Sequence, residues 1–306
     1  MKTLFTILPI CLILMFGCQK PGPIELIDET TPPQAIEIDT TSNKDEVLNP
    51  NNSEIDSGGY FATLSGRAYG QIIIGGARYD AGTEHHTASI AQAIFFNQTQ
   101  PLKRNNDTIG YHTINVGEMR INGLELFKPW RRFLLSSVPL RDTLVGPQYV
   151  LYNKDGIGGR GFEYEASKNY TWTASGVGNI SPFSFTLKST PIINVEAPLS
   201  NEVVSLTKNL LVKISGNVEY VTVFIRRKPL HPRDLDSKPI LKFKVAKRGQ
   251  GIIIPTAMLQ SLPRAQNAFL FSFLVEKNTT TTISGYPTKV LVNASYVHHV
   301  LFNVKR

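Results

Sequence analysis

The sequence contains very little cysteine. Its 306 residues include two cysteines, Cys11 and Cys18, and both lie near the N-terminus. The rest of the chain therefore has no disulfide framework, no cysteine-ligated zinc site and no cysteine nucleophile. A chain without disulfides must be stabilised by burial, and the hydrophobic content of 42% supplies enough residues for a core.

Several motifs of catalysis and cofactor binding are also missing. The sequence has no GxSxG, no GxxxxGK[ST] and no HExxH, so it lacks the serine-hydrolase elbow, the phosphate loop and the zincin helix. Beyond the N-terminal segment there is no run of eighteen apolar residues, so no other segment predicts a membrane-spanning helix. We expect a protein that is not an enzyme and has no cofactor.

The N-terminal segment has the features of a signal peptide. Lys2 supplies a positive charge, and residues 4–16 are almost wholly apolar. The segment ends in Met15-Phe16-Gly17-Cys18, which resembles the lipobox of bacterial lipoproteins, with a small residue before an invariant cysteine. Phe16 and Met15 depart from the commoner small residue and leucine of that motif.

The resemblance implies cleavage after residues 1–17 and lipid on Cys18. One acyl chain gives only marginal membrane binding, whereas the several chains of a lipoprotein anchor the protein stably. Gln19, in place of the aspartate that favours inner-membrane retention, favours the outer membrane. We expect an exported protein anchored to the bacterial cell envelope through Cys18, where nucleic acid is a poor choice of partner. An ordinary secretory signal or an uncleaved anchor is the alternative.

Charge is distributed unevenly along the chain. Residues 19–57, here called the acidic segment, carry nine acids and two lysines, whereas residues 191–306 carry sixteen cations and six acids. The acidic segment lacks aromatic residues and is rich in proline and asparagine, so it buries too little apolar surface to become ordered. We predict a disordered linker over residues 18–57. A brief strand where Ile36 and Ile38 alternate with acids is the less expected alternative.

From residue 58 onward the pattern favours β-structure. Short runs of β-branched and aromatic residues alternate with glycine, asparagine and proline, and no long segment has a helical period. We predict a β-sandwich-like domain over residues 58–190. Its expected strands are Gln71–Ile74, Ile90–Phe96, Tyr111–Val116, Phe133–Val138, Gln148–Tyr152, Phe162–Glu165, Tyr170–Thr173 and Phe183–Leu187.

Residues 191–306 predict a second β-domain. Their length and strand spacing match an immunoglobulin-like sandwich, although the cysteine pair of antibody domains is absent. One short helix is expected at Pro255–Leu262, because proline suits a first helical turn and Pro263 stops the helix. The predicted class is all-β, with two β-sandwich-like domains. The strands of the second are Ile192–Val195, Leu210–Ser215, Tyr220–Arg227, Ile240–Val245, Gly251–Ile254, Ala268–Val275, Lys289–Val292 and Val297–Val304.

Two motifs resemble a dinucleotide-binding site and a metal site, but the structure expected around each does not suit that role. Residues 155–161 contain GxGGxG, yet dinucleotide binding needs a helix next, and a strand is predicted there. Glu84, His85 and His86 are potential metal ligands, but neighbouring strand residues point to opposite faces. They share a metal only if the loop bends and the fold adds a ligand such as Asp80 or His112. We expect a hairpin loop at the first motif and exposed loop histidines at the second.

A cluster of cations gives the strongest indication of binding. Nine lysines and arginines fall within residues 226–248. Lys242 and Lys244 alternate with apolar residues, so both leave the sheet on one face. Together with Arg226 and Arg227 they predict a positive patch that attracts phosphates, acidic polysaccharides or anionic lipid headgroups. A solvated face whose lysines prevent strand aggregation is the alternative.

The two tryptophans differ in setting. Trp130 lies in a polar, turn-like stretch and is the better candidate for stacking on a sugar, whereas Trp172 lies in a predicted strand and is expected in the core. We predict a binding or structural module of the cell envelope that takes an anionic or glycan ligand through the basic second domain. A scaffold for an envelope protein and a polysaccharide hydrolase with dispersed carboxylates are the alternatives.

Overall fold

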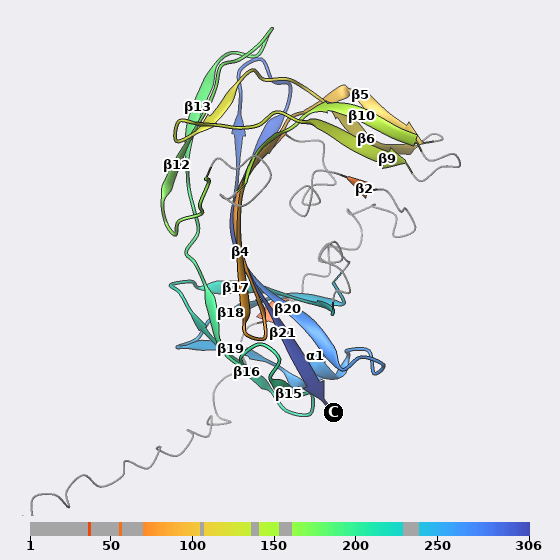
Figure 1. Ribbon diagram of the computed structural model, residues 1–306, viewed down its shortest axis with the longest axis vertical. Coiled ribbons are helices and arrows are strands. Elements are labelled where there is room, and N and C mark those ends of the chain that lie inside the picture. The colour runs from red at the N-terminus through yellow and green to blue at the C-terminus, as the bar shows by residue number, and fades with distance from the viewer. Residues whose placement is uncertain are drawn as a thin grey trace, which may run out of the picture. The chain divides into compact units, whose positions relative to one another are not determined.

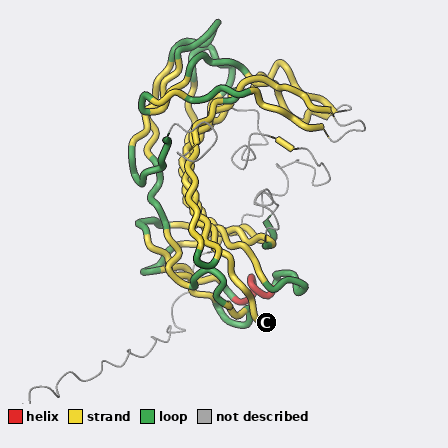
Figure 2. Tube along the Cα trace, viewed as in Figure 1, coloured by secondary structure: helices red, strands yellow, loops and turns green. Residues whose placement is uncertain are grey.

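The computed structural model describes residues 36–37, 55–56, 70–104, 107–135, 141–152, 161–228 and 239–306. Strands dominate these residues (Figure 2), and α1 (Thr256–Gln260) is their one helix. The all-β class is confirmed, and α1 lies within the predicted helical stretch. The signal peptide, Cys18 and residues 155–160 of the glycine motif lie outside the described residues.

Among the described residues, no helix has both the length and the apolar composition needed to cross a membrane.

The largest sheet, here called the main sheet, has nine strands. Its order is β1–β18–β17–β20–β21–β3–β4–β11, and β15 pairs with β21 from outside this path. Figure 1 labels β4, β20 and β21 among these strands. The strands are β1 (Ile36–Glu37), β3 (Gly70–Ala81), β4 (Glu84–Ile94), β11 (Tyr149–Tyr152), β15 (Val203–Ser205), β17 (Tyr220–Arg227), β18 (Leu241–Ala246), β20 (Ala268–Thr282) and β21 (Lys289–Lys305).

The main sheet joins the two halves of the chain. Strand β21 pairs in parallel with β3, from Val290 opposite Gly70 to Val300 opposite Asp80. Strands from before and after residue 190 therefore belong to one sheet. The division into domains at 58–190 and 191–306 stays a prediction, and we refer to these stretches as the first half and the second half.

The second half has the strand order of an immunoglobulin-like sandwich. A three-stranded sheet, in the order β14–β16–β19, faces β18–β17–β20–β21 of the main sheet. This arrangement corresponds to strands A, B and E facing C′, C, F and G. Val212 and Ile252 of one layer and Phe243 and Phe271 of the other are fully buried in one core. The strands of the smaller sheet are β14 (Asn194–Ala197), β16 (Leu210–Ser215) and β19 (Gly251–Ile254).

The first half has a second layer of its own, a four-stranded sheet in the order β13–β12–β7–β8. Trp172 of β12 is fully buried, as predicted. Phe95, which follows β4, packs edge-on against Phe183 of β13 with ring centroids 6.1 Å apart, so the two layers share a core. These strands are β7 (Met119–Ile121), β8 (Leu124–Glu125), β12 (Asn169–Ala174) and β13 (Phe183–Lys188).

Two small sheets complete the described fold. One consists of β5 (Phe96–Arg104) and β6 (Asp107–Thr113), and the other, in the order β10–β9–β2, of β10 (Arg141–Pro147), β9 (Trp130–Leu135) and β2 (Ile55–Asp56). Arg131 of β9 is buried and lies over the ring of Phe96, 5.3 Å from its centroid. A buried cation thus connects these two sheets.

The predicted strand Phe162–Glu165 is wrong, although its alternation is correct. Phe162 and Tyr164 are buried, and Glu163 and Glu165 are exposed. The backbone of this segment bonds to groups outside a strand ladder. The amide of Tyr164 donates to Ser89 Oγ at 3.0 Å, and that of Glu165 donates to the Tyr170 hydroxyl at 2.8 Å. Side chains have replaced the neighbouring strand as hydrogen-bond partners.

The predicted linker contains two short strands. Strand β1 pairs with β18, and β2 pairs with β9. At Ile36 the structure thus agrees with the alternative of a brief strand, because the edge of an existing sheet offers backbone partners even to a segment that has no core of its own. The linker over residues 18–57 stays a prediction. The other residues of the acidic segment lie outside the described residues.

Candidate functional site

The predicted basic residues lie on β17 and β18, which pair antiparallel. Residues 221, 223 and 225 of β17 are fully buried, so the alternate residues lie on the outer face of the sheet. The register sets Phe224 opposite Lys242 and Thr222 opposite Lys244. Opposed residues share a face, so both lysines lie on this outer side. We call this surface the basic face; it consists of Tyr220, Thr222, Phe224, Lys242 and Lys244.

Each of the two lysines of the basic face lies against an aromatic ring. The ammonium nitrogen of Lys244 lies 4.8 Å from the ring centroid of Tyr220, and that of Lys242 lies 5.7 Å from that of Phe224. A ring attracts a cation through its negative face. Lys244 and Tyr220 are exposed, and Lys242 is half-buried. The face thus presents ordered positive charge.

Arg226 does not add an exposed charge to this face, contrary to expectation. It is 5% exposed, and its guanidinium donates to Ser272 Oγ at 3.2 Å. The same hydroxyl lies 2.7 Å from Nδ1 of His299. Burial and the positive charge of Arg226 lower the pKa of His299 to about 3, so this ring is neutral. Arg226 anchors a buried network between β17, β20 and β21.

Arg227 is exposed, but strand alternation sets it on the other side of β17 from the basic face. The patch of four cations expected from the sequence therefore contains two, Lys242 and Lys244, on one face. The sequence analysis missed Tyr220 and Phe224. Their alternation with apolar residues, next to a strand of alternating lysines, was the signal that could have identified them.

Trp130 lies in a different sheet from the basic face. It is 64% exposed on β9, opposite Pro147 of β10, and Leu144 of β10 is 52% exposed. The structure thus leaves Trp130 accessible, as stacking on a sugar requires. No described strand is common to the sheets of Trp130 and the basic face.

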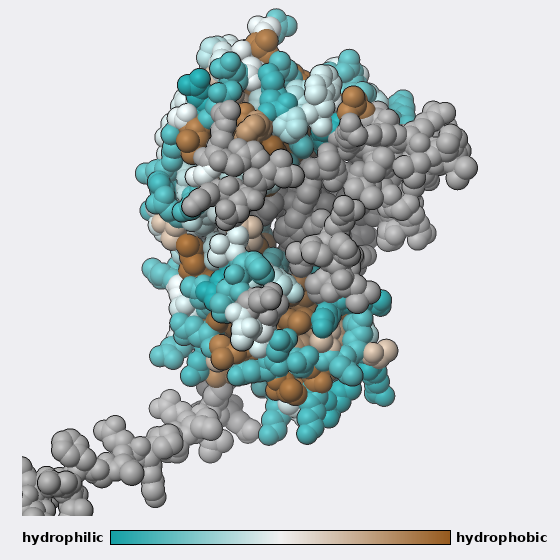
Figure 3. Space-filling model, viewed as in Figure 1, coloured by the Kyte–Doolittle hydropathy of each residue, from teal (hydrophilic) through white to brown (hydrophobic). Residues whose placement is uncertain are grey.

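Surface composition agrees with a polar exterior that has few large apolar groups. Hydrophilic and apolar residues are interspersed on the face shown in Figure 3. Among the exposed large hydrophobic residues, Tyr220 alone belongs to the basic face. Among the residues whose burial the structure describes, these are Leu124, Trp130, Leu144, Val177, Leu199, Val203, Leu211 and Tyr220.

Glu84, His85 and His86 lie on β4 rather than in a loop, although both histidines are exposed. The fold brings Asp80 to His85, with Oδ1 of the carboxylate 2.8 Å from Nδ1 of the ring. The described residues contain no group of three His, Cys, Asp or Glu side chains placed to hold a metal ion. Arg78 also donates to the same oxygen, at 2.9 Å, and its positive charge opposes a metal cation there.

The carboxylate of Asp80 is the centre of a partly buried polar group that we call the Asp80 cluster: Arg78, Asp80, His85 and His298. Nε2 of His298 lies 3.0 Å from Oδ2 of Asp80. Burial raises the pKa of Asp80, but hydrogen bonds from Arg78, His85 and His298 lower it to about 2. Asp80 is therefore ionised and satisfies donors from β3, β4 and β21.

Hydrogen bonding determines the tautomer of His298. The backbone amide of Val195 donates to Nδ1 at 2.8 Å, so the proton of the neutral ring is on Nε2, where it is donated to Asp80. Burial lowers the pKa of His298, which favours this neutral form. Arg78 also donates to Oδ1 of Asn194 at 3.2 Å. The Asp80 cluster thus attaches the β3–β4 hairpin to β14.

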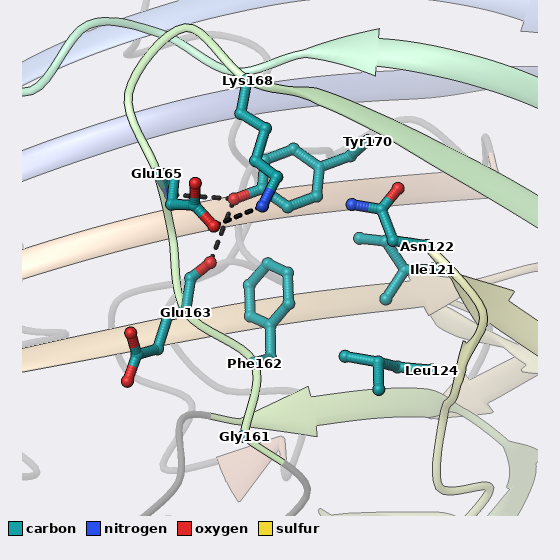
Figure 4. Close-up of a pocket in the computed structure, with 9 residues that line it drawn as sticks. All are labelled: Ile121, Asn122, Leu124, Gly161, Phe162, Glu163, Glu165, Lys168 and Tyr170. Atoms are coloured by element: carbon teal, nitrogen blue, oxygen red, sulfur yellow. Dashed lines mark hydrogen bonds and ion pairs between the residues drawn. The ribbon is translucent and has the colours of Figure 1, made fainter.

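A pocket of about 220 Å³ lies in the first half (Figure 4). Its polar groups largely satisfy one another. The Tyr170 hydroxyl donates to the carbonyl oxygen of Glu163 at 3.0 Å, and Lys168 forms an ion pair with Glu165. This self-pairing makes the pocket a weaker candidate for binding than the basic face. Its lining consists of Ile121, Asn122, Leu124, Gly161, Phe162, Glu163, Glu165, Lys168 and Tyr170.

Comparison with known proteins adds little to this description. No family model matches the sequence, and no curated protein matches it. A crystal structure of DIP-gamma IG1+IG2 is similar over 78% of this chain and 98% of its own, at 12% identity and a TM-score of 0.17. So low a TM-score does not establish a common fold. The immunoglobulin-like strand order therefore rests on the strand pairing of this chain.

Proposed function

We propose that the protein is a non-enzymatic binding module whose basic face takes an anionic polymer, such as an acidic polysaccharide. The observation that carries the proposal is the pair Lys242 and Lys244, each against an aromatic ring on one face of β17–β18. The half that contains them has ten more cations than acids. An excess of positive charge attracts polyanions and speeds their association.

The spacing of the two lysines favours a repeating ligand. Residues two apart on a strand are separated by about 7 Å, so the ammonium groups form a short row along β18. A polymer with regularly spaced acidic groups contacts both lysines at once, and multivalent contact compensates for the weakness of each exposed ion pair. Tyr220 adds an apolar surface beside Lys244 on which a sugar ring can stack.

The test is a charge reversal with a matched control. The double variant Lys242→Glu/Lys244→Glu should bind dextran sulfate at least about tenfold more weakly than wild type, because it replaces two attractions by two repulsions. Lys208→Glu/Lys213→Glu changes the net charge equally at exposed positions of the second half. Equal losses in both variants would show that binding depends on net charge alone, and the basic face would not be the site.

We further propose that lipid on Cys18 anchors the module to the cell envelope. The support is the resemblance of Met15-Phe16-Gly17-Cys18 to a lipobox at the end of an apolar segment. Fractionation of cells should find the wild-type chain in the membrane and Cys18→Ala in the soluble fraction. If the variant stays in the membrane as wild type does, the anchor is not lipid on this cysteine. Protease treatment of intact cells then reports which side the module faces.

A further inference from the structure

A tight turn builds one wall of the pocket in the first half. Asn122 and Gly123 join β7 to β8, with Ile121 opposite Leu124. Both turn residues have a positive φ, 48° and 81°, as in a type I′ hairpin, and asparagine and glycine adopt this conformation most readily. Leu124 is 38% exposed, so this wall offers an accessible apolar surface.

Two backbone hydrogen bonds fix the orientation of Asn122. Its amide donates to the carbonyl oxygen of Thr171 at 2.8 Å, and the amide of Thr171 donates to Oδ1 of Asn122, also at 2.8 Å. Because Oδ1 is the acceptor, the other atom of the side-chain amide is the donor Nδ2. Figure 4 shows this nitrogen on the side that faces Tyr170 and Lys168. It has no hydrogen-bond partner among the described residues, so it is available to a ligand.

The opposite wall combines an ion pair with aromatic rings. The Tyr170 hydroxyl accepts from the amide of Glu165 at 2.8 Å and donates to the carbonyl oxygen of Glu163 at 3.0 Å, so it fixes this segment to β12. Lys168 pairs with Glu165, and its ammonium nitrogen lies 5.8 Å from the ring centroid of Tyr170. Phe162 is buried and packs against Tyr170, with ring centroids 5.5 Å apart. The internal bonds of the pocket thus hold a carboxylate beside an ammonium group.

These groups match the chemistry of a sugar ring. The carboxylate of Glu165 accepts hydrogen bonds and the ammonium group of Lys168 donates them, so the pair suits two neighbouring hydroxyl groups. Asn122 Nδ2 donates to a third oxygen, and Leu124 packs against the C–H groups of the ring. The pocket volume of about 220 Å³ equals that of about seven water molecules at ~30 Å³ each, which is room for one six-membered ring with its substituents.

The charge of the pocket favours a neutral sugar. Its lining includes two carboxylates, Glu163 and Glu165, and one ammonium group, Lys168, so negative charge is in excess. Repulsion by this excess disfavours an acidic sugar. The basic face, whose two lysines attract anions, has the opposite preference. The pocket therefore suits a different ligand from that of the basic face.

We propose that the pocket binds one neutral pyranose unit of a glycan. Asn122 and Lys168 donate hydrogen bonds to its oxygens, Glu165 accepts one from a hydroxyl group, and Leu124 contacts its apolar side. The sugar site does not depend on the proposed function, because its residues, its ligand and its place in the fold all differ from those of the basic face.

The first measurement is a titration of the full chain followed by backbone amide NMR. The probes are methyl α-D-mannopyranoside, methyl β-D-glucopyranoside, methyl β-D-galactopyranoside, sodium glucuronate and L-phenylalanine. At least one of the three neutral glycosides should bind with a Kd of about 1 mM, the affinity that a ligand of this size reaches at ordinary efficiency. The shifts should change at residues 121–124 and 162–170, and glucuronate should bind at least about fivefold more weakly.

Three outcomes of this titration would overturn the sugar site. The first is unchanged shifts with all three neutral glycosides at about 100 mM, a hundredfold above the expected Kd. The second is tighter binding of glucuronate than of any neutral glycoside. The third is a response of the pocket residues to L-phenylalanine but to no glycoside, which would identify a site for a zwitterion.

The second measurement removes the two donors one at a time. Asn122→Gly deletes the side-chain amide at a residue whose positive φ glycine also adopts. Lys168→Met removes the ammonium group and keeps an unbranched chain. Each should raise the Kd at least about fivefold, because each removes a hydrogen bond to the sugar. The matched controls are Asn201→Gly, at another asparagine with positive φ, and Lys188→Met, at an exposed lysine outside the pocket. Both should bind like wild type, and unchanged amide shifts far from each substitution show that the variant is folded.

Two further variants distinguish the pocket from the other surfaces. Trp130→Ala should bind the glycoside like wild type. Loss of binding in Trp130→Ala, with wild-type affinity in Asn122→Gly and Lys168→Met, would overturn the pocket and assign the sugar to β9. Lys242→Glu/Lys244→Glu should keep the affinity for the glycoside while it loses that for dextran sulfate. Failure of the sugar site and failure of the proposed function are therefore separate results.

Discussion

Gly76 shows how one residue allows two elements to approach. It lies in the middle of β3, and a methyl group built on it would lie 2.7 Å from Cδ2 of Tyr296 and 2.8 Å from the ring of Tyr164. Tyr164 cannot move freely, because its hydroxyl lies 2.6 Å from Oγ1 of Thr190. The absence of a side chain at this position therefore lets the segment around Tyr164 pack onto the main sheet.

Gly76→Ala should lower the free energy of unfolding by about 1–3 kcal/mol, the usual range for overpacking a core. Gly110→Ala is the control, since its nearest neighbour, Leu102 Cδ1, is 3.6 Å from the added atom. Urea denaturation followed by circular dichroism measures both changes. A Gly76→Ala variant as stable as wild type would mean that the two rings move aside at no cost.

His299 makes the stability of the protein depend on pH. Its pKa is lowered to about 3 by burial and by Arg226, whereas a histidine in the unfolded chain titrates near 6.5. Below about pH 6.5 the unfolded chain takes up a proton that the folded chain does not bind, so stability falls as the pH decreases towards 3. His298, whose pKa burial also lowers, contributes in the same direction. Asp80, with a pKa of about 2, adds a loss at still lower pH.

The free energy of unfolding should therefore decrease between pH 7 and pH 4. In His299→Gln the decrease should be smaller, because one of the groups that titrates differently in the two states is gone. Urea titrations at several pH values provide the slope. Wild type measured in the same titrations provides the reference slope. An identical slope in wild type and His299→Gln would contradict this assignment.

At the scale of elements, the Asp80 cluster attaches the β3–β4 hairpin to β14. The hairpin turn makes a further contact there: the amide of Gly82 donates to Ser200 Oγ at 3.0 Å, and that hydroxyl donates to the carbonyl oxygen of Asp80 at 2.8 Å. Removing the carboxylate leaves Arg78 and the buried ring of His298 without their acceptor. Such an uncompensated buried group is costly.

Asp80→Ala should lower the free energy of unfolding by about 3 kcal/mol and speed amide exchange at Val195 and Gly82. Glu165→Ala removes an exposed ion pair with Lys168 and is the control, since it should change stability far less. Protected amides at Val195 and Gly82 in Asp80→Ala would show that the hairpin is attached by other contacts.

The centres of the strands were more predictable than their ends. Strands β16, β17 and β19 have the predicted bounds, because an alternating or β-branched run between turn residues is visible locally. Strand β21 was predicted as two strands, and Asn293 lies in the polar interruption between them. The structure pairs Asn293 with Asn278 through a hydrogen bond of 2.6 Å, so one continuous strand of 17 residues forms. The partner that satisfies Asn293 is on the neighbouring strand, so the sequence of β21 alone did not indicate that the strand continues.

The candidate site was predictable to a similar extent. The alternation that sets Lys242 and Lys244 on one face is a local property of β18, and the structure confirms it. The burial of Arg226 depends on Ser272, which belongs to another strand. Likewise, Asp80 and His298 are 218 residues apart and meet only because β3 and β21 belong to one sheet. No local pattern in the sequence indicates that such distant residues are in contact.

At the scale of the whole molecule, the continuous main sheet couples the two halves. Phe271 of β20 is fully buried in the second half, and Trp172 is fully buried in the first half. Because Phe271 lies on the main sheet and Trp172 on a layer packed against that sheet, destabilising one half should destabilise the other. Phe271→Ala should lower stability by about 3–5 kcal/mol.

Tryptophan fluorescence in urea tests this coupling, since both tryptophans belong to the first half. The transition reported by Trp172 should move to lower urea in Phe271→Ala, together with the transition seen by circular dichroism. Leu211→Ala, at a residue 41% exposed on β16, is the control and should move neither. An unshifted fluorescence transition in Phe271→Ala would show that the halves unfold independently.

The parallel pairing of β3 with β21 also affects the order in which the molecule can be built. Strand β3 is made early in synthesis, and its partner β21 begins at Lys289, more than two hundred residues later. A nascent chain that has not yet reached β21 leaves one edge of β3 unpaired, and contacts this distant in sequence form slowly. The unfinished chain therefore exposes a strand edge, which makes it prone to aggregation until the last strand arrives.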